Sequence, residues 1–161
     1  MTLHNCELYH KLGYCYGEIH NYEESINWYL KALELSPNDS TIHDLLRDLA
    51  QSYFKIKNYN EAIKFYTKCL EFEPENANIH GLIGVSYDTI QTDDDDEAYE
   101  LKTSALSHFE QALKYNQNNN NIIIHINIGG ILMDILREDE AIEHFKKALE
   151  LVLSFLLYYY K

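Results

Sequence analysis

The sequence is poor in residues that interrupt regular structure and in residues that mark common functional sites. Only two of its 161 residues are proline and six are glycine, which favours long regular elements with few breaks. The three cysteines form no C-x-x-C pair and are odd in number, so we expect no disulfide framework and a reducing compartment. The first residues, "MTLHNCELYH", lack a basic stretch followed by an apolar run and predict no signal peptide.

Positive charge is also scarce. Lys and Arg number 13 against 26 Asp and Glu, which gives a formal net charge of −13. This balance argues against binding to nucleic acid or to an anionic membrane surface, and it fits a protein or peptide partner of apolar and basic character. The longest apolar stretch, "LVLSFLLYYY", is about half the ~20 residues that a membrane helix needs, so no membrane insertion is expected.

Sequence motifs of catalysis are missing. There is no nucleophile elbow, P-loop, H-E-x-x-H or dinucleotide-binding glycine motif, and no Ser or Cys is paired with a His and an acid at a recognisable spacing. We therefore expect a protein that is not an enzyme and has no cofactor. Cys6 and His10 stand four residues apart and could hold a metal on a helix, but further ligands are lacking. A surface patch is the better interpretation, and no metal site is predicted.

The acidic run Asp93–Asp96, followed by Glu97, has a structural interpretation. A calcium loop of the EF-hand type needs alternating ligands and a central glycine, whereas these acids are consecutive and no glycine is present. Acidic side chains at the beginning of a helix are stabilised by its dipole. The run therefore predicts a helix start, with Thr92 or Asp93 as the N-cap.

What the sequence does contain is a repeated pattern. The stretch "NYEESINWYLKALELSPND" returns as "NYNEAIKFYTKCLEFEPEN" and, without its proline, as "REDEAIEHFKKALEL". Apolar and small residues recur at spacings of three, four and seven, as on one face of a helix, and each copy contains two such segments. Small residues alternate with Tyr and Phe, as closely packed helices require. The predicted fold class is all-α, built from antiparallel helix pairs.

These residues resemble a known family. Tyr9-x2-Leu12-Gly13-x2-Tyr16 resembles the first-helix pattern W-x2-L-G-x2-Y of the tetratricopeptide repeat, with Tyr in place of Trp. The A-x3-F pattern of the second helix is matched at Ala141 and Phe145, among other places. The resemblance covers about residues 6 to 153 in four copies. It implies a short right-handed solenoid of about eight helices, because one helix pair cannot bury its own apolar face.

The predicted limits follow from the repeat register. The predicted segments are a lead-in at 1–5, repeat 1 with a short extension at 6–42, repeat 2 at 43–76, repeat 3 at 77–121 with an acidic insertion near 91–100 and an Asn-rich turn, repeat 4 at 122–153, and an apolar tail at 154–161. The third helix should begin early, near Ser40 or Thr41, and the insertion should lengthen the second helix of repeat 3. His80 and His125 fall at the bulky aromatic position of the pattern, where we expect packing with one polar edge in water.

The resemblance also implies a function. In this family the first helices line a concave groove that commonly binds an extended peptide or a partner helix. We therefore expect a non-catalytic protein–protein interaction module, an adaptor or scaffold, in which Arg47 and Asp48 orient the partner by charge. The candidate groove residues are Arg47, Asp48, Gln51, Leu82, Val85, Ile126, Asn127 and Met133.

Alternatives remain open at this point. The apolar groove residues could instead be covered by the tail or by a neighbouring repeat of a longer protein. The chain could also be a structural or self-associating subunit, including a homodimer through its C-terminal tail, or the repeat portion of a truncated multidomain enzyme. The scaffold itself does not choose between these roles.

The sequence does not fit one subclass of this family, the chaperone adaptors. Chaperone adaptors grip a C-terminal carboxylate with Lys, Asn and Arg side chains. The matching positions here are His10, Tyr14, Asp48, Asn78 and Leu82 or, one copy further, Arg47, Gln51, Leu82, Ile123 and Asn127. Asp48 would repel a carboxylate, so binding to such chaperone tails is not expected. The expected location is the cytoplasm, with the nucleus as the alternative.

Overall fold

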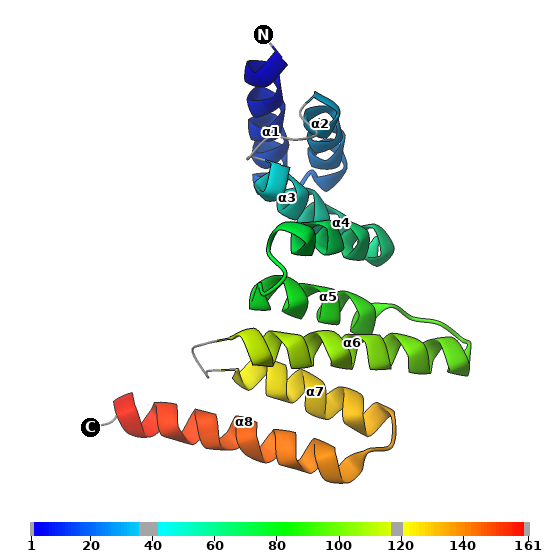
Figure 1. The fold of residues 1–161 in the computed structure, drawn as a ribbon, viewed down its shortest axis with the longest axis vertical. Coiled ribbons are helices and arrows are strands. Elements are labelled where there is room, and N and C mark those ends of the chain that lie inside the picture. Colours follow the sequence, from blue (N-terminus) through cyan, green and yellow to red (C-terminus); the bar gives the residue numbers. More distant parts are fainter. Residues whose placement is uncertain (1, 36–41, 117–120, 160–161) are drawn as a thin grey trace. The chain divides into compact units, whose positions relative to one another are not determined.

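Helices make up all the regular structure of the described chain. The structure is a computed structural model that describes residues 2–35, 42–116 and 121–159. Their order is α1 (Thr2–Glu18), α2 (Tyr22–Leu35), α3 (Ile42–Lys55), α4 (Tyr59–Phe72), α5 (Ala77–Thr89), α6 (Asp95–Tyr115), α7 (Ile122–Asp134) and α8 (Glu138–Tyr159) (Figure 1). The chain divides into two compact units, Met1–Pro74 and Glu75–Lys161.

The first unit holds two helix pairs that share one core. Helix α1 packs along α2 and α3 packs along α4, while α2 also contacts α3 and so joins the pairs. Tyr29 and Ala32 of α2 are buried together with Leu45, Leu49 and other apolar residues of α3. Neither pair could bury these residues alone, so the two pairs form a single packed body.

The second unit repeats this arrangement with α5, α6, α7 and α8. Helix α5 packs along α6 and α7 along α8, and α6 contacts α7 between them. The core cluster contains Ala105, Leu106 and Phe109 of α6, Ile128, Ile131 and Leu132 of α7, and Ala141 of α8. The predicted fold class, all-α with stacked antiparallel helix pairs, is therefore confirmed.

Three of the turns within the pairs are closed by the same backbone hydrogen bonds. The residues in the left-handed region are His20, Lys57 and Leu136, with φ of 62°, 63° and 60°. In each turn the next N–H donates to a carbonyl in the last helical turn, at 2.9 Å for Asn21 to Tyr16 and for Asn58 to Tyr53 and at 2.8 Å for Arg137 to Leu132. This is the Schellman closure of a helix end. The repeat is thus visible in the backbone as well as in the side chains.

The turn between α5 and α6 differs because of the acidic insertion. Helix α6 is 21 residues long, so the second helix of this pair is lengthened as expected. Its N-cap is Asp94, whose side chain accepts a hydrogen bond from the Glu97 N–H at 2.9 Å, while the Thr92 hydroxyl donates to the Glu97 carboxylate. The expectation of Thr92 or Asp93 as the cap was therefore wrong, because Thr92 bonds the Glu97 side chain instead. The expected early start of the third helix, near Ser40 or Thr41, lies outside the described residues.

Two histidine pairs occupy equivalent places in the last two helix pairs. His80 of α5 lies with its Nδ1 at 3.1 Å from Nδ1 of His108 on α6, and His125 of α7 lies at 3.0 Å from His144 on α8. In the first pair Tyr9 and Trp28 stand at this position, with ring centroids 5.5 Å apart. The expectation for His80 and His125 was therefore incomplete, because each imidazole also faces a second histidine.

Each histidine pair is suited to the neutral state. A hydrogen bond between two imidazoles needs one ring to donate and the other to accept, which a doubly charged pair cannot do. Burial lowers the pKa of His108, and the neighbouring His80 lowers it further. Burial and then His144 likewise lower the pKa of His125. Burial also lowers the pKa of His144, although Glu110 and Glu140 act in the opposite direction.

Candidate functional site

An apolar groove lies between α5 and α7 in the second unit. Its volume is about 710 Å³, and the aromatic ring of Phe109 from α6 forms part of its wall. We refer to it as the α5–α7 groove. Its lining residues are Ala77, Asn78, Gly81, Leu82, Val85, Phe109, Asn116, Asn121, Ile122, Ile123, Ile124 and Asn127.

Helical spacing brings the groove residues to one side. Asn78, Leu82 and Val85 are four and three residues apart and therefore share a face of α5. Gly81 lies on the same side, and a Cβ built there would have no atom within 4 Å, so the glycine widens the groove rather than serving a close contact. Helix α7 contributes Ile123 and Asn127 with the same four-residue spacing.

The structure brings together some of the candidate residues and leaves others apart. Leu82, Val85 and Asn127 line the α5–α7 groove. Ile126 and Met133 are exposed on α7 but are not part of its lining. Val85 is half-buried and packs against the core cluster, so it supports the fold as well as the groove.

Sequence reasoning missed the end of the groove. The Asn116 side chain donates a hydrogen bond to Asn121, and both line the groove together with Ile122. Asn116 and Asn121 are the first and last residues of the Asn-rich tract, for which the sequence predicts only a turn. The sequence feature that could have indicated them is the apolar run "IIIHI" at the start of α7, which directly follows Asn121.

The first unit carries a smaller and more polar pocket of about 280 Å³. Asp48 and Gln51, two of the candidate groove residues, belong to its lining, whereas Arg47 does not. Burial, with Asp48 as the next cause, raises the pKa of Tyr29 in this pocket to about 12, so its phenol stays protonated. The lining residues are Tyr14, Gly17, Glu18, His20, Tyr22, Tyr29, Asp48, Gln51, Ser52 and Lys55.

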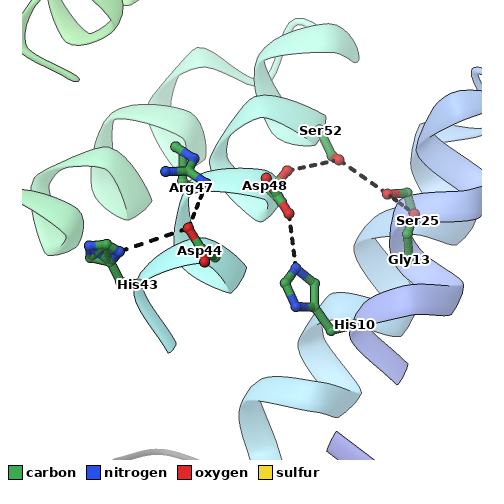
Figure 2. Close-up of polar contacts among 8 residues, drawn as sticks. All are labelled: His10, Gly13, Ser25, His43, Asp44, Arg47, Asp48 and Ser52. Atoms are coloured by element: carbon green, nitrogen blue, oxygen red, sulfur yellow. Dashed lines mark hydrogen bonds and ion pairs between the residues drawn. The ribbon is translucent and has the colours of Figure 1, made fainter. Parts of the chain in front are cut away.

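Polar contacts hold the α1, α2 and α3 side chains around this pocket (Figure 2). His10 Nε2 lies 2.9 Å from a carboxylate oxygen of Asp48, and the Ser52 hydroxyl donates to the Asp48 carbonyl at 3.0 Å. The Ser25 hydroxyl lies 3.2 Å from that of Ser52 and donates to the Gly13 carbonyl at 2.8 Å. Asp48 is therefore fixed in position by the chain itself.

Arg47 is also engaged within the chain. Its guanidinium donates to Asp44 at 2.6 Å, three residues earlier on α3, and the pair is exposed. An exposed ion pair of this kind contributes about 0–1 kcal/mol, so a partner's carboxylate could compete for the guanidinium at small cost. The charge on Arg47 thus remains accessible, whereas the Asp48 carboxylate is already in contact with His10.

The cysteine and histidine candidates for metal binding do not come together. Cys6 is buried, and its Sγ donates to the Ala32 carbonyl at 3.4 Å, while His10 turns to Asp48. The interpretation of Cys6 as part of a surface patch was therefore wrong. Burial raises the pKa of the Cys69 thiol to about 11, which keeps it protonated and unreactive. In the part of the chain that the structure describes, no group of three or more His, Cys, Asp or Glu side chains could hold a metal ion.

The stacked helix pairs, the repeated turns and the groove on the first-helix side define a helical-repeat protein of the kind that presents a binding surface. Comparison with known protein families identifies the type of repeat. Family patterns described as tetratricopeptide repeat match residues 5–75 and residues 123–151. The chain belongs to the tetratricopeptide repeat family.

Solved structures of the protein MamA share this fold. A crystal structure of MamA is 24% identical, with a TM-score of 0.78, over 94% of this chain and 81% of that one. MamA residues 41 to the end from Desulfovibrio magneticus RS-1 are 21% identical, with a TM-score of 0.77, over 92% and 76%. A MamA RS-1 double mutant is 21% identical, with a TM-score of 0.79, over 93% and 76%. No curated protein matches the sequence.

The family assignment supports a general role in binding other proteins. Tetratricopeptide arrays stack their repeats into extended surfaces that serve as interaction scaffolds. Among the described helices, none combines the length and the apolar character needed to cross a membrane.

Proposed function

We propose that this protein is a non-catalytic adaptor that binds an apolar peptide segment of a partner protein in the α5–α7 groove. The observation that carries the proposal is the groove itself. Its volume of about 710 Å³ lies within the usual range of ligand clefts, and Leu82 and Ile123 present exposed apolar side chains at its rim. Exposed apolar surface gathered in one place is typical of interaction sites.

The chemistry of the lining favours an extended peptide. Asn78 on α5 and Asn127 on α7 bring amide groups to opposite sides of an otherwise apolar groove. An amide side chain both donates and accepts, and so can satisfy the N–H and C=O groups of an extended backbone. Apolar side chains of the peptide would contact Leu82 and Val85. Basic flanking residues would be favoured by the net charge of −13.

The polar candidate residues of the first unit form a separate part of this proposal. Arg47 and Asp48 carry opposite charges on α3, and Gln51 lies one turn from them. We assign to them polar contacts with the partner on the surface of the first unit itself. Ile126 and Met133, exposed on α7, would extend the apolar contact beyond the groove.

The proposed place of action is the cytoplasm. Cys6, Cys15 and Cys69 are free thiols, and Cys15 is exposed. Free exposed thiols persist where the compartment is reducing.

A selection from a displayed library of random short peptides tests the proposal. We expect the wild-type protein to enrich apolar peptides with basic flanks, and Leu82→Asp and Ile123→Asp to weaken their binding at least about tenfold in a calorimetric titration. Both side chains are exposed, so the substitutions should leave helix content by circular dichroism unchanged, whereas Val85→Asp would also disturb the core. Tyr99→Asp is the matched control, because the exposure of Tyr99 on α6 lies between those of Leu82 and Ile123 but the residue is outside the groove.

The proposal fails on either of two results. The library could enrich no peptide, or the enriched peptides could bind Leu82→Asp and Ile123→Asp as tightly as they bind Tyr99→Asp. The second result would place the binding surface elsewhere on the chain.

A further inference from the structure

The last helix carries an apolar face that the described residues do not cover. Ile142 is 47% exposed and Leu149 is 58% exposed, and Phe145 between them is also exposed. With Leu153 and Leu156 these residues follow the three- and four-residue spacing of one helix face. We call Ile142, Phe145, Leu149, Leu153 and Leu156 the α8 stacking face.

The repeat register shows what normally covers this face. Ile142 and Phe145 occupy on α8 the positions that Leu106 and Phe109 occupy on α6. Leu106 is 6% exposed, and both α6 residues belong to the core cluster in which α7 covers them. In the first unit Ile26 of α2 has the same place and is 6% exposed, and α2 contacts α3. In these two cases the first helix of the next pair covers the face.

The complementary face is uncovered on the first helix. Leu8 of α1 and Ile19, which directly follows α1, stand at the positions of Ile124 of α7 and of Ile135, the C-cap of α7, and both isoleucines pack against the core cluster that α6 shares. Leu8 and Ile19 are instead 55% and 69% exposed. Cys15, equivalent to a buried isoleucine of α7, is exposed as well. We call Leu8, Leu12, Cys15 and Ile19 the α1 stacking face.

The two helices that carry these faces are also long at matching ends. Helix α1 has 17 residues, against 13 for α7, and its extra turn is at its N-terminus. Helix α8 has 22 residues and its extra length is at its C-terminus, where Leu153 and Leu156 lie. Successive helices of the stack run antiparallel, so the C-terminal end of α8 would meet the N-terminal end of an α1 packed against it. The N-terminal extension of α1 and the C-terminal extension of α8 would therefore lie beside each other in such a contact.

We propose that the α8 stacking face of one copy packs on the α1 stacking face of a second copy, in the geometry of the α6–α7 contact. Such an interface is heterologous, because the two copies contribute different surfaces. Each added copy leaves one α1 face and one α8 face uncovered, so association continues beyond the dimer unless the assembly closes into a ring.

One charged position opposes the proposed contact and provides a test of its register. Lys102 on α6 forms ion pairs at 2.8 Å with Asp88 of α5 and with Asp134 of α7. In the proposed contact Glu138 takes the place of Lys102, and Glu18 of the second copy takes the place of Asp134. Two carboxylates therefore meet where the internal contact has an attractive pair. Glu138→Lys should tighten association about threefold by restoring that pair, and Glu138→Lys combined with Glu18→Lys should cancel the gain.

A mixing experiment on the full chain tests the head-to-tail geometry. Leu149→Asp blocks the α8 stacking face and Leu8→Asp blocks the α1 stacking face. Both residues are more than half exposed, so the folds should remain intact by circular dichroism. In sedimentation velocity we expect the wild type to associate with rising concentration and each variant alone to stay monomeric. An equimolar mixture of the two variants should form a dimer and stop there, because one intact α8 face meets one intact α1 face.

Other results would overturn the proposal. A wild type that is monomeric at every concentration would show that no second copy covers the face. Association of Leu8→Asp that equals the wild type would show that α8 pairs with itself in a symmetric dimer. The groove does not enter this contact, so Leu82→Asp should associate as the wild type does even if peptide binding is lost.

Discussion

Gly13→Ala is a substitution for which helix propensity and tertiary packing have opposite effects. Alanine favours a helix interior over glycine by about 1 kcal/mol. However, a Cβ at Gly13 would lie 2.4 Å from Cδ1 and 2.5 Å from Cε1 of Tyr29. The Tyr29 side chain is only 3% exposed, so the added methyl group must displace the ring from its packed position.

The expected result is a net loss of stability. Overpacking of a core costs about 1–3 kcal/mol, which exceeds the gain in propensity, so Gly13→Ala should destabilise the first unit by up to about 2 kcal/mol. Gly17→Ala, one turn further along α1, is the control. Its Cβ would be 3.4 Å from the Ser25 hydroxyl, an ordinary contact, and it should stabilise by about 0.5–1 kcal/mol.

The assay is urea unfolding followed by fluorescence of Trp28, the only tryptophan in the chain, which lies in the same unit. The two variants should shift the unfolding midpoint in opposite directions with an unchanged slope. A Gly13→Ala variant as stable as the wild type would refute the close approach of α1 and α2. Loss of stability in both variants would mean that α1 tolerates no added methyl group on this side, and packing against Tyr29 would not be the cause.

Two further predictions concern stability of the second unit. The pKa of His108 lies below its ordinary value of about 6.5, so on acidification the unfolded chain takes up a proton before the folded chain does. The stabilisation that is present above about pH 6.5 should therefore be lost as the pH falls through the lowered pKa. The double substitution His80→Leu with His108→Phe should flatten the melting temperature between pH 7.5 and about 5.5; an equal slope in the variant would refute this. Hydrogen bonds to two aspartates raise the pKa of Lys102 although burial alone would lower it, and Lys102→Met should cost about 1 kcal/mol in urea unfolding, less at high salt. Lys146→Met, which breaks only an exposed pair with Glu143, should cost less, and equal losses would contradict the role given to Lys102.

The helix pairs could be predicted because each repeat satisfies the same packing rule locally. Gly13, Gly84 and Gly129 recur at one position of the first helices, and each faces an aromatic ring of the helix that follows it. A Cβ at these positions would come within 2.4 to 3.0 Å of the ring. This pairing of small with large residues is written in the sequence at a fixed spacing, so the periodicity alone was sufficient to find it.

The histidine pairs could not be predicted in the same way. His108 and His144 each precede the phenylalanine of the A-x3-F pattern, at a position that Trp28 and Phe65 fill in the first unit. The pattern does not specify this residue, and its partner lies on another helix. Whether two imidazoles meet depends on the rotation of both helices, which is set by packing throughout the pair.

The candidate groove was only partly predictable for a related reason. The family pattern indicates which residues of the first helices point away from the core, and Leu82 and Asn127 do line the groove. It does not indicate how far the groove extends along each helix. Met133 shares a helix with Asn127 but lies outside the lining, because the groove follows the first turns of α7 to Asn121 and Asn116.

The two apolar surfaces of the second unit call for different occupants. The α5–α7 groove has amides on both sides, which suits an extended chain with unsatisfied backbone groups. The α8 stacking face has only apolar side chains at helical spacing, so it suits a helix whose backbone is already hydrogen-bonded. A net charge of −13 opposes contact between copies, and the Glu138–Glu18 pair would add to that repulsion. Self-association should therefore be weaker than the apolar area alone would give, whereas the same charge favours a basic peptide in the groove.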